Sequence, residues 1–207
     1  WTEQDIYSLP AENDLYEFKG SQMLDVANNS DNVRDELAKQ LSAFANYGGG
    51  YLIYGVKDPA KNNGIIEVDN GGVSLEIKKK TSPTAWLEST MPYLTDPPIT
   101  KFKISEIPGS GKGSNVSPDR CLVVIEIAAS ETAPHQSSRD YKYYGRIGST
   151  SVPLSHRMVV DIANRPKHPR IELIFERRGD ANDSFLHVAF KNTGLIYAKY
   201  INAIIDF

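Results

Sequence analysis

One long segment of the chain has apolar side chains at helical spacing. Val33, Leu37 and Leu41 fall on one face of a helix, whereas charged and polar residues fill the opposite face. Residues 29–31, Asn-Ser-Asp, offer an N-cap for this helix, and the glycines at 48–50 provide a left-handed stop. The pattern therefore predicts an amphipathic helix that ends just before residue 48.

Two further segments have the pattern of shorter helices. Residues 82–94 begin with Ser82 as a cap and Pro83 in the first turn, which is where proline is tolerated in a helix. Residues 155–165 form the second segment. Apolar or alternating runs between these helices predict strands at residues 14–20, 51–56, 65–68, 99–107, 121–128 and 141–155. We therefore expect an α+β domain over residues 1–165, with a mixed sheet flanked by helices.

The remainder of the chain, residues 166–207, has a different character. A stiff "RPKHP" segment is followed by three strand patterns, at 171–178, 184–192 and 198–207, and no helical pattern is left. We expect a small all-β unit here, the truncated start of a β-sandwich. Its remaining strands would belong to a missing C-terminal domain, and assembly into a homo-oligomer is left open.

Composition narrows the class of protein only modestly. The formal net charge is −3, so a site for a polyanion has to be a local patch. Cys121 is the only cysteine, which excludes an intrachain disulfide and a zinc site made of cysteines. The chain lacks an apolar run of about 18 residues and a signal-peptide pattern, so the sequence predicts a cytoplasmic protein without a membrane span.

Four segments in a fixed order carry a family resemblance. They are "ENDLYEFKG" (12–20), "LSAFANYGGGYLIYGVKDP" (41–59), "CLVVIEIAASETAP" (121–134) and "YKYYGRIGSTSVPLS" (141–155). Together they resemble the Schlafen AlbA-like domain, a family also described as divergent AAA or DNA-binding. The second segment, with Ala-Asn before a glycine run and a strand that ends in Gly-Val-x-Asp, is the most specific of the four.

The resemblance implies binding of RNA or DNA. In one branch of the family it implies a metal-dependent endoribonuclease that acts on structured RNA and uses Mg²⁺ or Mn²⁺. The family's three catalytic and metal-binding acids would then be Glu12, Glu17 and Asp58, with Lys19 as the conserved lysine of the same strand. Lys57 is a departure, since many members have a second acid at this position.

The chemistry of these residue types suits such a site, and other roles remain open for them. Carboxylates are the ligands that Mg²⁺ and Mn²⁺ prefer, although most acids in proteins are simply solvated. Lys19 lies two residues after Glu17, so both side chains project from the same face of a strand. It could hold a phosphate, neutralise the acids or form an ordinary surface ion pair.

Aromatic and basic residues elsewhere are candidates for a nucleic-acid surface. Tyr144 and Arg146 combine a ring for stacking on a base with a guanidinium for phosphate, although a tyrosine in such a strand can also belong to the core. Lys78, Lys79 and Lys80 form the densest basic run, which is either a phosphate-binding patch or a solvated face.

ATP binding is poorly supported. The segment "PGSGKGSN" lacks the spacing of a phosphate-binding loop, and no helical pattern follows it. The leading hypothesis from the sequence is therefore a nucleic-acid-binding domain with an endoribonuclease site. The alternatives are a non-catalytic DNA-binding or regulatory sensor domain and an oligomerisation scaffold.

Overall fold

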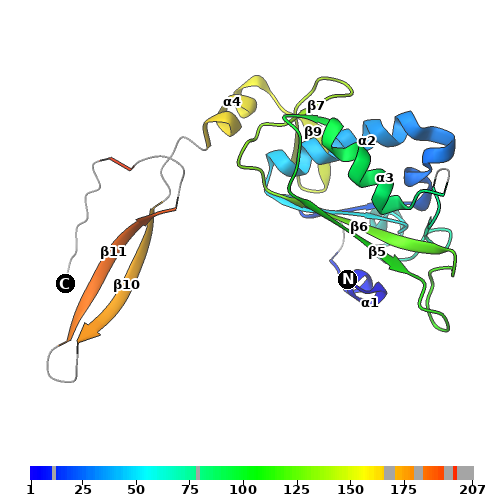
Figure 1. Ribbon diagram of the computed structural model, residues 1–207, viewed down its shortest axis with the longest axis horizontal. Coiled ribbons are helices and arrows are strands. Elements are labelled where there is room, and N and C mark those ends of the chain that lie inside the picture. Colours follow the sequence, from blue (N-terminus) through cyan, green and yellow to red (C-terminus); the bar gives the residue numbers. More distant parts are fainter. Residues whose placement is uncertain (11–12, 78–79, 166–170, 180–183, 194–197, 200–207) are drawn as a thin grey trace. The chain divides into compact units, whose positions relative to one another are not determined.

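The computed structural model describes the chain except for residues 11–12, 78–79, 166–170, 180–183, 194–197 and 200–207 (Figure 1). Contacts between residues divide it into two units, Trp1–Val159 and Val160–Phe207.

A mixed five-stranded sheet forms the centre of the first unit. Its strands run in the order β1-β2-β6-β3, and β5 also pairs with β6. β1 and β2 are parallel, whereas the pairs that β6 makes are antiparallel. The strands are β1 (Tyr16–Lys19), β2 (Gly49–Tyr54), β3 (Val73–Ser74), β5 (Phe102–Pro108) and β6 (Arg120–Ala128). The predicted α+β class with a mixed sheet is confirmed.

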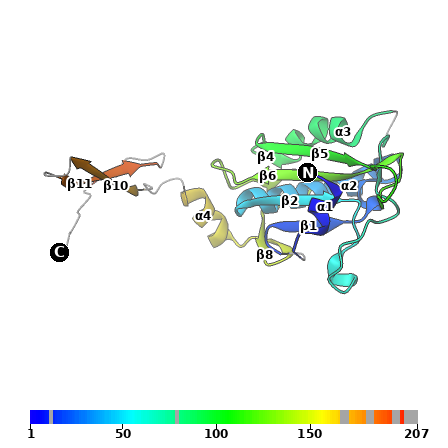
Figure 2. The same cartoon turned by 90° about the horizontal axis from the view of Figure 1, so that it is seen from below.

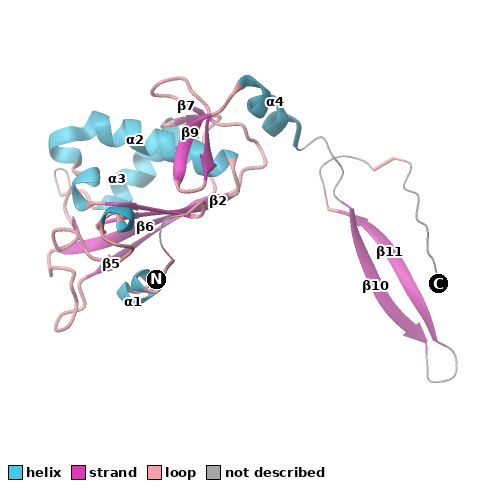
Figure 3. Ribbon diagram, turned by 180° about the vertical axis from the view of Figure 1, so that it is seen from behind, coloured by secondary structure: helices cyan, strands magenta, loops and turns pink. Residues whose placement is uncertain are grey.

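Helices lie on both sides of this sheet. α2 (Val26–Asn46) and α3 (Pro83–Thr90) cover one face, and the short α1 (Glu3–Tyr7) lies on the other (Figures 2 and 3). Leu37 and Leu41 of α2 pack in the larger apolar core with Leu52, whereas Ile6 of α1 packs with Phe18 and Ile53 in a second core. This division follows from the alternation of side chains along each strand.

Short elements complete the first unit. The β8–β9 hairpin packs on α2, and β4 pairs with β7. Their bounds, with those of the three 3₁₀ helices, are η1 (Ser21–Leu24), η2 (Pro59–Lys61), η3 (Met91–Tyr93), β4 (Thr95–Asp96), β7 (Gln136–Ser137), β8 (Tyr144–Ile147) and β9 (Thr150–Pro153).

The long helix begins earlier than the sequence predicts. Asp25 is its N-cap and accepts a hydrogen bond from the backbone of Asn28, but Asn29 has non-helical angles of φ −146° and ψ 46°. The predicted cap therefore coincides with a kink inside α2. At the other end, Gly49 has φ 79°, and a Cβ there would lie 2.5 Å from the carbonyl oxygen of Ile127. The glycines thus do more than stop the helix, because they let β2 approach β6 closely.

The predicted start of α3 is confirmed, whereas the predicted strand at residues 65–68 is wrong. Ser82 caps α3, as predicted, by accepting a hydrogen bond from the backbone of Ala85. Residues 65–68, predicted as a strand, form only an isolated bridge between Val56 and Val68. This segment is short and faces solvent at Ile65, so it has too few neighbours to extend the ladder.

The second unit contains an antiparallel hairpin. β10 (Ile171–Gly179) and β11 (Ser184–Asn192) pair along their whole length, from Ile171 with Asn192 to Gly179 with Ser184. α4 (His156–Asn164) precedes the hairpin in the chain, as the sequence predicts. The third predicted strand lies almost entirely outside the described residues, and the expectation of a truncated β-sandwich stays a prediction.

Asn46 explains the asparagine that precedes the glycine run. Its buried side chain accepts a hydrogen bond of 2.6 Å from the backbone of His135 and donates bonds of 2.9 Å to the carbonyl oxygens of His135 and Tyr144. Three backbone groups from two distant segments are thereby satisfied at the end of α2. The side chain ties these segments to the helix.

We expect Asn46→Asp to destabilise the first unit by about 3 kcal/mol or more, because a carboxylate cannot donate to two buried carbonyl oxygens. The size of the side chain is unchanged, so the variant isolates the loss of the donor. Urea unfolding followed by circular dichroism measures the effect. An Asn46→Asp protein as stable as the wild type would show that these bonds contribute little.

Candidate functional site

Glu17, the central predicted acid, is a buried residue of β1. It is 6% exposed and faces α2. One carboxylate oxygen lies 2.5 Å from Arg146 Nη1, and the other lies 2.7 Å from Lys19 Nζ. Gln40 of α2 also donates to it over 3.4 Å. Both oxygens of the Glu17 carboxylate therefore already have cationic partners.

Arg146 of β8 is the main partner of Glu17. Its side chain is fully buried, with the guanidinium 4.7 Å from the centre of the Phe44 ring. Besides Glu17, it donates to the carbonyl oxygen of Asn13 over 2.6 Å and to Ser151 Oγ over 3.2 Å. The predicted phosphate contact needs an exposed guanidinium, and in this structure Arg146 instead joins the β8–β9 hairpin to β1.

Lys19 and Glu36, whose side chains are 19% and 23% exposed, extend the buried pair of Glu17 and Arg146 into a cluster of four charges, which we call the buried charge cluster. Lys19 Nζ lies 3.1 Å from Glu36 Oε1. Burial lowers the pKa of Lys19, but the charges of Glu17 and Glu36 outweigh it and hold this pKa above its ordinary value. Burial raises the pKa of Glu36, but the Gln40 hydrogen bond and the Lys19 charge outweigh it, so this pKa is lowered. The two carboxylates and two cations balance, which makes their burial tolerable.

Tyr144 is also an internal residue. It is 7% exposed, its backbone donates to Ser42 Oγ over 3.0 Å, and its hydroxyl donates to Asp140 over 2.5 Å. Burial and the hydrogen bond to Asp140 raise the pKa of Tyr144 to about 12. In this structure its ring therefore belongs to the protein interior, which was the alternative that the sequence left open, and it is not available for stacking on a base.

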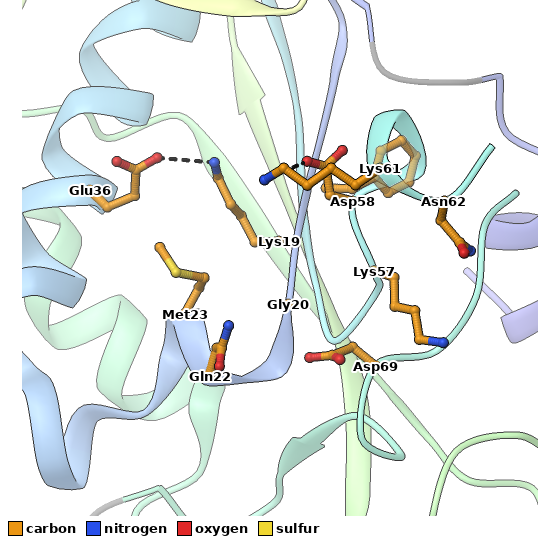
Figure 4. Close-up of a pocket in the computed structure, with 11 residues that line it drawn as sticks. Lys19, Gly20, Gln22, Met23, Glu36, Lys57, Asp58, Lys61, Asn62 and Asp69 are labelled. Carbon is orange, nitrogen blue, oxygen red and sulfur yellow. Dashed lines mark ion pairs between the residues drawn. The ribbon is translucent and has the colours of Figure 1, made fainter. Parts of the chain in front are cut away.

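A pocket lies at the ends of β1 and β2, and Figure 4 shows its side chains. Its volume is about 570 Å³. We call it the strand-end pocket. Its lining residues are Phe18, Lys19, Gly20, Gln22, Met23, Glu36, Lys57, Asp58, Lys61, Asn62 and Asp69.

Asp58, the third predicted acid, lines this pocket, whereas Glu17 does not. One Asp58 oxygen accepts from the backbone of Ala60 over 2.9 Å, and the other lies 3.2 Å from Lys61 Nζ (Figure 4). Lys57 forms a similar pair, 2.8 Å from Glu67. The side chains of Lys57 and Lys61 are exposed, whereas that of Asp58 is partly buried.

Asp69 is a pocket acid that sequence reasoning missed. The isolated bridge from Val56 to Val68 turns the chain back, and the backbone of Asp69 donates to the carbonyl oxygen of Gly55 over 2.8 Å. The Asp69 carboxylate accepts from the backbone and the hydroxyl of Ser21, each over 2.8 Å. The predicted return of residues 65–68 to the sheet was the signal that could have placed Asp69 in the same pocket as Asp58.

The predicted metal ligands are only partly described. Glu12 lies outside the described residues, Glu17 is enclosed by Arg146 and Lys19, and Asp58 is in the pocket. Among the described residues, no group of three or more His, Cys, Asp or Glu side chains is arranged to hold a metal ion. Glu17 and Asp58 alone do not fit a metal site, and the role of the full trio stays a prediction.

The predicted basic run is also only partly described. Lys78 and Lys79 lie outside the described residues, whereas Lys80 is exposed in a turn with φ 64°. A phosphate-binding role for this run stays a prediction. Across the described part of the chain, no helix has the length and apolar character needed to cross a membrane.

We expect Arg146→Met to destabilise the first unit by about 3–5 kcal/mol, because it leaves the buried Glu17 carboxylate without its main counter-ion. The double variant Glu17→Met and Arg146→Met should recover much of this loss. The exposed pair of Arg139 and Asp35, 2.5 Å apart, supplies the control, and Arg139→Met should cost less than about 1 kcal/mol. Equal effects of the two arginine substitutions would contradict the assignment.

Comparisons with known proteins find one matching family and similar solved structures. No curated protein matches the chain. Among solved structures, the DIP2311 protein from Corynebacterium diphtheriae is similar at 18% identity and a TM-score of 0.48. The match covers 73% of this chain but only 24% of that protein. Residues 12–155 match the family model described as Schlafen, AlbA_2, and family membership suggests a nucleic-acid-binding domain. Because the matched residues make up well over half of this chain, the chain belongs to the Schlafen, AlbA_2 family.

Proposed function

We propose that this chain is a nucleic-acid-binding domain that holds the phosphate backbone in the strand-end pocket. The observation that carries the proposal is that Lys19, Lys57 and Lys61 line one cavity in a chain whose net charge is −3. Membership of the Schlafen, AlbA_2 family supports it. A chain without overall positive charge needs local cationic side chains in order to bind a polyanion. The three lysines supply them, beside the carboxylates of Glu36, Asp58 and Asp69 that line the same pocket.

The three lysines differ in how readily they can meet a phosphate. Lys57 and Lys61 have side chains 48% and 85% exposed, in ion pairs with Glu67 and Asp58. Exposed pairs of this kind are weak, so a phosphate oxygen can replace the carboxylate. The hydrogen bond and charge of Glu67 raise the pKa of Lys57, which is therefore cationic at neutral pH. Lys19 is held at the back of the pocket by the buried charge cluster.

A second function has one observation in its favour. Asp58 and Asp69 line the same pocket as the lysines, and one or two carboxylates with substrate phosphates are the usual protein environment of Mg²⁺. Binding of Mg²⁺ or Mn²⁺ there would agree with a metal-dependent endoribonuclease, the activity that one branch of the family resemblance implies. The proposal of nucleic-acid binding does not depend on this activity.

We expect Lys57→Gln combined with Lys61→Gln to weaken binding about tenfold and to lower the slope of log affinity against log salt by about 1–2, because fewer counterions are released. Fluorescence anisotropy with labelled transfer RNA, single-stranded RNA and duplex DNA measures both quantities and distinguishes RNA from DNA. Lys142→Gln is the matched control, because Lys142 is 58% exposed and paired with Asp140 but does not line the pocket. An unchanged salt slope in the double variant would exclude phosphate binding at this pocket.

We expect the purified domain to bind transfer RNA in the presence of Mn²⁺ without cutting it, and gel electrophoresis of the RNA tests this. Cleavage that is lost in Asp58→Asn but kept in Glu131→Gln, an acid remote from the pocket lining, would establish the endoribonuclease. Glu17→Ala is a poor probe, because removing a buried counter-ion disturbs the fold as well.

A further inference from the structure

We infer that a row of aromatic rings on the sheet face opposite α2 stacks on the unpaired bases of a single-stranded nucleic acid. The row consists of Trp1, Tyr16 and Tyr51, and we call it the aromatic row. The inference rests on the nucleic-acid binding in the proposed function and not on the strand-end pocket, and it deepens that function by naming the class of nucleic acid that the domain would bind.

The rings of the aromatic row are held in a defined arrangement. Tyr16 of β1 and Tyr51 of β2 are partners in the parallel register, and their rings stack with centroids 5.4 Å apart and an angle of 15°. The Trp1 ring meets Tyr51 edge-on at 5.4 Å and 70°. Such offset-stacked and edge-to-face contacts are the preferred geometries of aromatic pairs.

The aromatic row lies away from the buried charge cluster. Side chains alternate along β1, so Tyr16 and Phe18 face one side of the sheet, and Glu17 and Lys19 face α2 on the other. Tyr16 and Tyr51 pack against the second core, which includes Phe18 and Ile53. This support holds the rings in place, so little conformational freedom is lost when a base binds.

The aromatic row is partly open to solvent, whereas Tyr144 is buried. Trp1 is 41% exposed, and Tyr16 and Tyr51 are each only partly buried. Stacking on a base needs an accessible ring that the protein holds from one side. The exposed Trp1 and the two supported tyrosines meet this requirement, whereas the ring of Tyr144, at 7% exposed, does not.

Polar groups that match a nucleotide continue the row across the sheet. Glu126 of β6 is the register partner of Tyr51, and Lys103 of β5 is the partner of Glu126. The Glu126 carboxylate is an acceptor for the amino edge of a base, and the exposed Lys103 ammonium is a donor for a phosphate. The Tyr51 phenol is a further hydrogen-bond donor, and burial, Glu126 and Tyr16 raise its pKa.

Two tryptophans make the row directly observable. Trp86 is 6% exposed in the core, so a ligand that stacks on the protein surface changes the emission of Trp1. The probes are a 12-nucleotide single-stranded RNA of mixed sequence and a strand of equal length with abasic sites throughout. The abasic strand keeps the phosphates and removes the bases. We expect quenching of the Trp1 emission by the RNA and not by the abasic strand, and about tenfold tighter binding of the RNA.

Substitutions connect this result to particular rings. Tyr51→Leu should weaken binding of the RNA about five- to tenfold and leave binding of the abasic strand unchanged. Trp1→Phe should abolish the quenching and keep most of the affinity. Tyr93→Leu is the matched control, because Tyr93 is 79% exposed and lies in η3, outside the row. Circular dichroism checks that Tyr51→Leu is folded, and the Trp1 readout does not depend on that variant.

Equal affinity for the two strands, together with no quenching, would overturn the inference, because the row would then serve only to pack β1 against β2. The proposed function would survive that outcome if the abasic strand still responded to the substitutions of Lys57 and Lys61. If instead the RNA bound more tightly than the abasic strand while the substitutions of Lys57 and Lys61 had no effect, phosphate binding in the strand-end pocket would be excluded. Base stacking on the aromatic row would then be supported.

Discussion

The ion pair between Glu17 and Arg146 is the constraint on which the first unit depends. It joins the strand at the edge of the central sheet to a hairpin that lies more than a hundred residues further along the chain. Lys19, Glu36 and Gln40 complete the pair, so two carboxylates balance two cations, although Arg146 Nε is left without a hydrogen-bond partner among the described residues. An unbalanced charge at this depth would cost several kcal/mol, on the order of 3–5. The cluster therefore fixes the hairpin, α2 and β1 as one body.

The charged residues of the first unit fall into two groups, those buried in the framework and those in solvated ion pairs that a ligand can replace. Glu17 and Arg146 are committed to each other, whereas Lys57, Asp58 and Lys61 are carried by a solvated loop at the strand ends. Lys19 belongs to both environments, because it contacts Glu17 inside and also lines the strand-end pocket. A phosphate bound in the pocket would contact Lys19, which also pairs with Glu17. Binding in the pocket is therefore linked to the charge cluster that holds β1, α2 and the hairpin together.

Local sequence patterns predicted the main helices and strands well. They did not predict the positions of side chains whose partners lie far away in the chain. The period of Val33, Leu37 and Leu41 predicts α2, and Ser82 marks the start of α3, because caps and apolar spacing act over a few residues. The interior positions of Arg146 and Tyr144 depend on segments far away in the chain, and no local pattern contains them. Asp69 is an intermediate case. Its position follows from the bridge between Val56 and Val68, which the sequence indicates only through the short apolar run at residues 65–68.

The isolated bridge between Val56 and Val68 has a consequence for how the pocket can vary. Residues 57–67 form a loop that this one bridge closes, and none of them belongs to a strand of the sheet. Lengthening such a loop costs little entropy, and changes in its sequence do not disturb the ladder between β2 and β6. Changes in the length or charge of this loop can therefore alter the pocket wall without disturbing the ion pair between Glu17 and Arg146.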